Sequence, residues 1–99
     1  MKLRLSGDAK ADLRRAFVYI AKDRPRAAEI VVERIMAGLR VFAKNPRIGR
    51  PGRMPDTREW VIRRTGYVAI YTVSEDAVTV FRIIHGHQNW PPGEAAGEP

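Results

Sequence analysis

The side chains best suited to binding chemistry are arginines concentrated in one short stretch. Residues 44–64 contain seven basic and two acidic side chains, a large part of the net charge of +7 carried by the 99-residue chain. Six of the seven are arginine, whose planar guanidinium pairs with phosphate or carboxylate oxygens. Glycines and prolines interrupt the stretch, so we expect much of this charge on a loop, where binding groups often lie. We predict that Arg47, Arg50, Arg53 and Arg64 bind a phosphate or the surface of a target.

A second set of arginines could stabilise charge during catalysis. Metal-independent RNA cleavage uses the 2′-OH as nucleophile and needs a base, an acid and cations beside the phosphate. Arg58, Arg63 and Arg82 could supply these cations if they meet on the exposed face of a sheet.

Arg82 is the most informative of the three. Strict alternation places it on one strand face with Val78, Val80 and Ile84, so we expect it to be partly desolvated and to need an anion. The alternative is an internal salt bridge to Glu59 or to another carboxylate of the chain.

Three further residues could move protons. His85 and His87 have side chains with a reference pKa of roughly 6.5, and Tyr71 could act as an acid or stack on a base. Alternation puts His85 on the face opposite Arg82. The structural alternatives are hydrogen-bonded histidines and an ordinary sheet tyrosine. The two histidines have no third ligand nearby, so we expect no metal site and no cofactor.

Composition narrows the class of protein. Apolar residues make up 44% of the chain, which is enough for a globular core, and there is no cysteine for a disulfide or a thiolate site. No apolar run approaches the ~20 residues of a membrane span, and no secretory signal is visible. We therefore expect a cytoplasmic protein with a phosphate-rich or acidic partner and no membrane association.

The first half of the chain has the apolar periodicity of two helices. Residues 2–5 alternate like a short strand, and Ser6 is a suitable N-cap for a helix over residues 7–22. Pro25 suits the first turn of a second helix, which should end at Asn45, before a proline. The short connection predicts an antiparallel helical hairpin.

The second half reads as a loop followed by strands. We predict a loop over 46–57, strands over 58–64, 67–73 and 78–85, and a two-residue turn at Thr65-Gly66. The last strand is apolar on both faces, which favours a central position. The expected fold is α+β: a strand, a helical hairpin and a three-strand antiparallel meander, with the helices on one face of the sheet. Residues 1–90 would form a single domain and residues 91–99 a disordered tail.

The order of short motifs over residues 3–90 resembles the RelE/ParE superfamily of toxins from type II toxin–antitoxin systems. The residues that carry the resemblance are spread along the chain: Ala9, Asp12, Leu13, Tyr19-Ile20-Ala21, Pro25, Ala27-Ala28, Asn45-Pro46, Ile48-Gly49-Arg50-Pro51-Gly52-Arg53, Thr57-Arg58-Glu59, Tyr67, Tyr71, Arg82-Ile83-Ile84-His85-Gly86-His87 and Trp90.

This resemblance implies a growth-inhibiting toxin that is neutralised by a cognate antitoxin. RelE-like members cut messenger RNA on the ribosome, whereas ParE-like members poison DNA gyrase. The loop lysines and the late tyrosine of the RelE type are replaced here, since Arg50 and Arg53 occupy the loop and no tyrosine follows Tyr71. Arginine is a poor proton shuttle, so we favour gyrase poisoning or an unclassified mode. The alternatives are a metal-independent, ribosome-dependent mRNA endoribonuclease and a non-catalytic basic module that binds nucleic acid.

Overall fold

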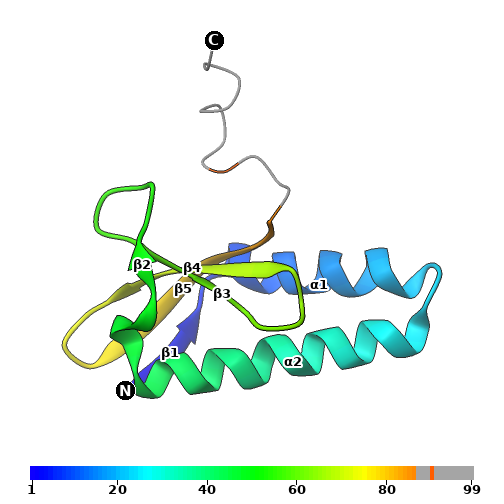
Figure 1. Ribbon diagram of the computed structural model, residues 1–99, viewed down its shortest axis with the longest axis horizontal. Coiled ribbons are helices and arrows are strands. Elements are labelled where there is room, and N and C mark those ends of the chain that lie inside the picture. Colours follow the sequence, from blue (N-terminus) through cyan, green and yellow to red (C-terminus); the bar gives the residue numbers. More distant parts are fainter. Residues whose placement is uncertain (87–89, 91–99) are drawn as a thin grey trace, which may run out of the picture.

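Two helices lie against one face of a five-stranded sheet in the computed structural model, which describes residues 1–86 and 90 (Figure 1). The elements follow the order β1 (Lys2–Leu5), α1 (Gly7–Ala21), α2 (Pro25–Lys44), η1 (Pro46–Ile48), β2 (Arg50–Pro51), β3 (Arg58–Val61), β4 (Tyr67–Val73) and β5 (Ala77–His85). The α+β class, the helical hairpin and the antiparallel meander are as the sequence predicts. The predicted tail over 91–99 lies outside the described residues.

Local signals account for the boundaries of both helices. The Ser6 hydroxyl accepts a hydrogen bond from the Ala9 N–H at 3.0 Å, which caps the free N–H groups at the start of α1. Pro25 occupies the first turn of α2, and this helix ends at Lys44, before the Asn45-Pro46 pair. Neither helix, nor any other in the described part of the chain, is long and apolar enough to cross a membrane.

The sheet has the strand order β1-β5-β4-β3-β2. β1 runs parallel to β5, and the remaining neighbours are antiparallel. β1 covers the edge of β5 only as far as Val80, which pairs with Leu5. From that point to His85, β5 has α1 beside it and no described strand on that edge, so the predicted central position holds for only half of the strand.

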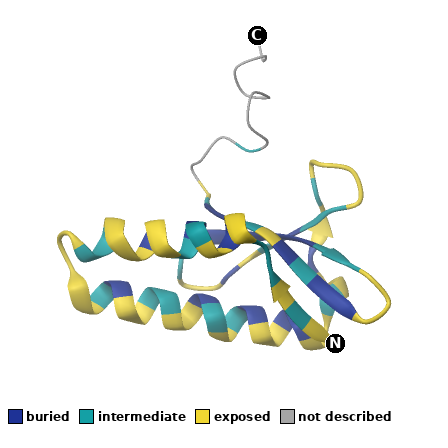
Figure 2. Cartoon of the chain, turned by 180° about the vertical axis from the view of Figure 1, so that it is seen from behind, coloured by how far each residue is buried: buried dark blue, intermediate teal, exposed yellow. Residues whose placement is uncertain are grey.

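The core lies between the sheet and the hairpin (Figure 2). Its largest side chains are fully buried: Ile35, Leu39, Phe42, Ile62, Tyr71, Val78, Val80 and Ile83. A smaller cluster on the opposite face of the sheet comprises Val68, Ile70 and Ile84, with Trp90 packed on it. We call this opposite side of the sheet the far face.

The loop before the meander is more ordered than predicted. Residues 46–57 contain the single 3-10 turn η1 and the two-residue strand β2, which pairs with Arg58 and Glu59 of β3. The prediction of a loop over residues 46–57 is therefore wrong at Arg50 and Pro51, which form a strand. The small extra strand forms because Arg50 and Pro51 lie opposite an otherwise unpaired edge of β3.

The connection between β3 and β4 also differs from the prediction. β3 ends at Val61 rather than at residue 64, and Ile62 N–H donates to Tyr67 O at 2.9 Å. Arg64 and Gly66 both adopt left-handed backbone conformations, with φ of 63° and 76°. These conformations produce a turn wider than Thr65-Gly66, so Arg63 belongs to the turn and has no place on a strand face.

A β-bulge in β5 reverses the expected side-chain alternation. Ile70 of β4 pairs with Arg82, whereas the next residue, Tyr71, pairs with Val80, so Phe81 is the extra residue. Val80 consequently faces the helices, and Arg82 lies on the far face with Ile84. The prediction that Arg82 shares a face with Val78 and Val80 is wrong because alternation restarts after the bulge.

Candidate functional site

Arg82 is held by a carboxylate of its own chain. Its Nε donates to Asp12 Oδ2 at 2.7 Å and its Nη2 donates to Asp12 Oδ1 at 3.1 Å, a two-pronged ion pair that joins β5 to α1. The guanidinium also lies 5.6 Å from the centre of the Trp90 ring. The alternative interpretation of Arg82, an internal salt bridge, is confirmed, and the partner is Asp12.

Asp12 is a buried acceptor for three donors. Besides Arg82, its carboxylate accepts from Arg15 Nη2 at 2.7 Å and from the Ile83 N–H at 2.9 Å. Burial alone would raise the pKa of Asp12, but the hydrogen bonds from Arg82, Ile83 and Arg15 outweigh it and lower the pKa. The Ile83 N–H lies on the part of the β5 edge that β1 leaves open, so Asp12 occupies the place of a neighbouring strand there.

A second buried carboxylate organises the arginine loop. Glu59 Oε2 accepts the Arg53 backbone N–H at 3.0 Å, and Glu59 Oε1 accepts Nη2 of Arg50 at 3.2 Å and Nη2 of Arg53 at 3.4 Å. Burial acts to raise the pKa of Glu59, but the hydrogen bonds from Arg53 and Arg50 lower it. Both arginine side chains remain at least half exposed.

Arg58 and Tyr71 lie together on the helix-facing side of the sheet. Arg58 pairs with Tyr71 across β3 and β4, and its Nη1 donates to Gly49 O at 2.8 Å. The fully buried Tyr71 hydroxyl donates to Pro46 O at 2.7 Å and accepts the Gly49 N–H at 3.0 Å. Burial raises the pKa of Tyr71. The hydroxyl thus donates one hydrogen bond to the backbone and accepts one from it, as expected for a structural tyrosine of the sheet.

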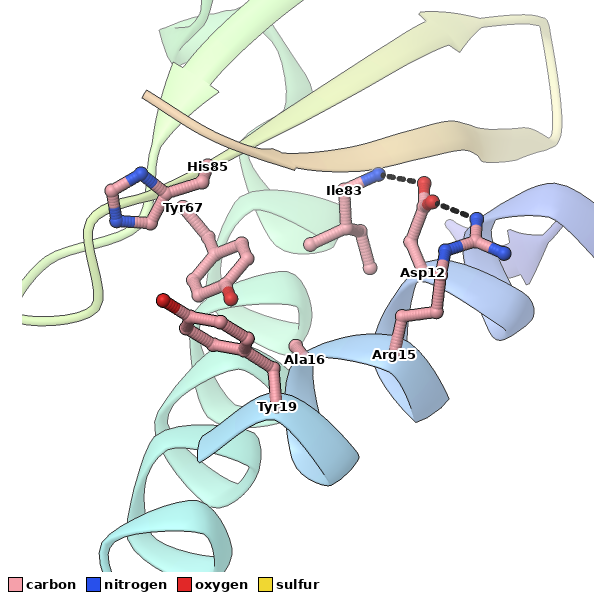
Figure 3. A pocket seen from close by; sticks show the side chains of 7 residues that line it. All are labelled: Asp12, Arg15, Ala16, Tyr19, Tyr67, Ile83 and His85. Atoms are coloured by element: carbon pink, nitrogen blue, oxygen red, sulfur yellow. Dashed lines mark hydrogen bonds and ion pairs between the residues drawn. The ribbon is translucent and has the colours of Figure 1, made fainter. Parts of the chain in front are cut away.

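His85 lines a cavity of about 370 Å³ between α1 and the open edge of β5 (Figure 3). Its ring stands edge-on to the ring of Tyr67, with 5.3 Å between the ring centres. His85 lies on the face of the sheet opposite Arg82, as alternation predicts. Tyr19 projects from α1 toward Tyr67, and burial raises the pKa of the Tyr67 hydroxyl. Asp12 and Arg15 form the other end of the cavity. His87 lies outside the described residues.

Four of the predicted phosphate-binding or catalytic arginines have no ion pair within residues 1–86 and 90, and one of them, Arg58, donates to backbone carbonyl groups instead. Arg47 is exposed on η1, and Arg63 and Arg64 are exposed in the turn after β3. Within the same residues, no group of three or more histidine or carboxylate side chains could hold a metal ion.

The structure therefore disperses the residues predicted for catalysis. Arg58 and Tyr71 occupy the helix-facing side beside η1, Arg82 lies on the far face, and Arg63 lies in a turn. His85 faces the cavity beside α1. The requirement that Arg58, Arg63 and Arg82 meet on one exposed face is not fulfilled.

The sequence analysis assigns no functional role to Asp12 or Glu59, although both occur among the residues that carry the family resemblance. Asp12 lies between Ala9 and Ala16 on the buried stripe of α1. A charged residue at such a position needs a buried partner, and Arg82 is the only basic side chain after residue 64. An acid on the buried stripe of a helix and a single late arginine together indicate that Asp12 and Arg82 form an ion pair. Glu59 precedes Trp60 on the predicted strand, where the sequence indicates it as a possible partner of Arg82.

Three comparisons place the chain among known proteins. The family model described as the ParE toxin of the type II toxin–antitoxin system parDE matches residues 3–90. The Sinorhizobium fredii protein named "Putative toxin Y4kP" is 44% identical over 73 residues, which cover 74% of this chain and 75% of that protein.

Solved structures share the fold. The chromosomal ParDE system from P. aeruginosa matches with a TM-score of 0.79 and 24% identity over 86% of this chain and 95% of the other. The E. coli RelBE toxin–antitoxin complex matches with a TM-score of 0.62 and 21% identity, covering 88% and 98% of the two chains. The RelBE2 complex of Mycobacterium tuberculosis matches with a TM-score of 0.55 and 26% identity, covering 85% and 95%. With the family model spanning almost the whole described fold, the chain belongs to the ParE toxins of type II toxin–antitoxin systems, within the RelE/ParE superfamily.

Proposed function

We propose that this toxin arrests bacterial growth by inhibiting DNA gyrase and that a cognate antitoxin neutralises it. The observation that carries the proposal is the ion pair between Arg82 and Asp12. It removes from phosphate binding the arginine that RNA cleavage would most need, while membership of the ParE family favours the gyrase mechanism.

The candidate proton-transfer groups give further support. RNA cleavage needs an acid and a base within hydrogen-bond reach of the same phosphate as the cations. Tyr71 is buried with its hydroxyl bound to Pro46 and Gly49, and His85 faces α1 on the side of the sheet opposite Arg82. Among the described residues, the geometry thus offers no acid–base pair beside a free guanidinium.

The outer surface of α1 is our candidate antitoxin-binding surface. Val18 and Tyr19, which are adjacent in the sequence, are 58% and 74% exposed. They line a shallow hollow of about 610 Å³ together with Arg14, Arg15 and Lys22. A mixed apolar and basic surface suits an acidic, amphipathic segment that folds as it binds.

The test compares two activities of the same toxin preparation. The toxin is released from its complex with the antitoxin and added to a gyrase supercoiling assay and to an in vitro translation reaction followed by primer extension. We expect supercoiling to be inhibited, full-length messenger RNA to persist, and added antitoxin to restore supercoiling. Cleavage of translated messenger RNA with unaffected supercoiling would overturn the proposal in favour of a RelE-like nuclease.

Expression without the antitoxin provides the cellular control. We expect growth arrest with induction of the DNA-damage response. Normal growth with soluble toxin, together with salt-sensitive binding to naked nucleic acid, would instead indicate a basic binding module without toxic activity.

A further inference from the structure

Four residues from four strands form a row on the far face of the sheet. The pairing register places Arg50 of β2 beside Glu59, Glu59 beside Ile70, and Ile70 beside Arg82. Adjacent strands lie about 4.8 Å apart, so Ile70 is about 10 Å from Arg50 along this row. The row has a cation at each end, and Ile70 is its apolar member.

An apolar hollow opens beside this row. It has a volume of about 440 Å³, and its walls include Met54, Pro55, Phe81 and Trp90 around Ile70. Met54 and Phe81 are 39% and 41% exposed. The bulge at Phe81 and the turn that carries Met54 bring these side chains to the same place, from positions far apart in the sequence.

The charges around the hollow favour a protein segment over RNA. Arg82 at one end is paired with Asp12, and the carboxylate of Asp8 also lines the hollow. At the other end of the row Glu59 is shared by two arginines, Arg50 and Arg53, which leaves an excess of one positive charge. A polyanion needs several unneutralised cations, whereas an apolar cavity with one net cation nearby suits an apolar side chain followed by a carboxylate.

Trp90, in the wall of the hollow, carries an unpaired hydrogen-bond donor. Its indole Nε1 is withdrawn from solvent and has no hydrogen-bond acceptor among the described residues. Buried donors without acceptors are rare in native proteins. The indole would have to turn outward for a carbonyl group of a bound segment to become its acceptor.

We infer that the far face is the surface through which the toxin contacts its protein target. The hollow receives a bulky apolar side chain from an extended segment of the target. A carboxylate two or four residues along the same segment pairs with Arg50 and Arg53, since these positions lie on the same side of an extended chain as the apolar residue, about 7 or 13 Å from it. This inference rests on the proposed function, because it assigns a surface to the inhibition of gyrase.

The test uses single glutamate substitutions at exposed apolar residues in three places. Phe81→Glu and Met54→Glu introduce a charge into the hollow, and Val18→Glu alters the proposed antitoxin surface on α1. Val41→Glu is the matched control, since Val41 is 57% exposed on α2 and lines neither surface. Each variant is checked for its thermal unfolding midpoint, antitoxin binding and gyrase inhibition.

We expect Phe81→Glu and Met54→Glu to raise the toxin concentration needed for half-inhibition of gyrase about tenfold or more. Both should bind the antitoxin within about twofold of the unsubstituted chain. Val18→Glu should show the reverse pattern, and Val41→Glu should change neither property. Arg50→Glu should weaken gyrase inhibition several-fold, since it reverses the charge at the end of the row.

Three results would overturn the inference. One is undiminished gyrase inhibition by folded Phe81→Glu and Met54→Glu variants. Another is a loss of antitoxin binding by Phe81→Glu and Met54→Glu that is as large as their loss of gyrase inhibition, which would assign the far face to the antitoxin. The third is salt-sensitive binding of a single-stranded RNA oligonucleotide that both substitutions abolish.

The proposed function can fail separately. If the unsubstituted toxin arrests growth without inhibiting gyrase, and Phe81→Glu abolishes the arrest while Val41→Glu does not, the target is another protein. In that case the far face keeps its role and gyrase is discarded.

Discussion

Asp12 and Glu59 are two buried carboxylates with nearly the same set of partners. Each accepts one backbone N–H and the guanidinium groups of two arginines. They differ in what they connect: Asp12 joins α1 to β5 across 70 residues, whereas Glu59 joins β3 to a loop only six to nine residues away. The same chemistry therefore fixes the packing of two layers in one region and the shape of the arginine-rich loop in the other.

The arginines that pair with these two carboxylates also differ in their exposure to solvent. The Arg82 side chain is 25% exposed, whereas those of Arg50 and Arg53 are 64% and 50% exposed. A partly buried guanidinium loses much of its hydration and depends on its carboxylate, while an exposed one returns to water at little cost. Removing the carboxylate should therefore be costly in the first region and mild in the second.

The largest effect is expected for Asp12→Ala. This change leaves Arg82 without its counter-charge and the Ile83 N–H without an acceptor, so we expect the free energy of unfolding to fall by about 3 kcal/mol. Urea denaturation monitored by tryptophan fluorescence measures it, with exposed Asp23→Ala as the control. A loss under ~1 kcal/mol would remove the distinction between the two regions.

Glu59→Ala should cost less, about 1–2 kcal/mol, because its two arginines can be hydrated once released. The Arg53 N–H loses its acceptor, so the loop over residues 50–57 should become more accessible to protease. Limited proteolysis with trypsin, which cleaves after arginine, reports on this directly, with exposed Glu75→Ala as the reference. A loop as resistant as that of the unsubstituted chain would mean that Glu59 does not shape it.

Acidification should weaken both regions. The folded state lowers the pKa of both carboxylates, so their stabilisation is complete above their unfolded pKa values near 4 and is lost as pH falls through the lowered folded values. The free energy of unfolding should therefore decrease as the pH is lowered from 6 to 2. Asp12→Asn should flatten this decline more than Glu59→Gln, and equal slopes would indicate equally strong networks.

The smallest effects are expected for the exposed arginines. Arg15 and Arg50 have side chains 68% and 64% exposed, so Arg15→Ala and Arg50→Ala should each change the unfolding free energy by under ~0.5 kcal/mol. Thermal denaturation of the two variants side by side measures this. A clearly larger loss for either would show that its guanidinium, rather than the backbone N–H, dominates that network.

Much of the fold was predictable because its signals are local. The Ser6 cap, Pro25 at a helix start and Asn45-Pro46 at a helix end act on their own neighbours in the chain, and the structure confirms each. Apolar runs between turn residues likewise identified β4 and most of β5. The errors fall at β2, at the wide turn after Val61 and at Phe81, where pairing across strands or a left-handed backbone decides the geometry.

The candidate site was less predictable, since its residues come from distant segments. The sequence by itself determined the positive charge, the helical hairpin and the presence of an acid on the buried stripe of α1. Only the tertiary structure decided that Asp12 takes Arg82, that the bulge turns Arg82 to the far face, and that Arg50, Glu59, Ile70 and Arg82 form one row. Strand order and a single inserted residue fix which side chains are neighbours, and neither leaves a periodic signal in the sequence.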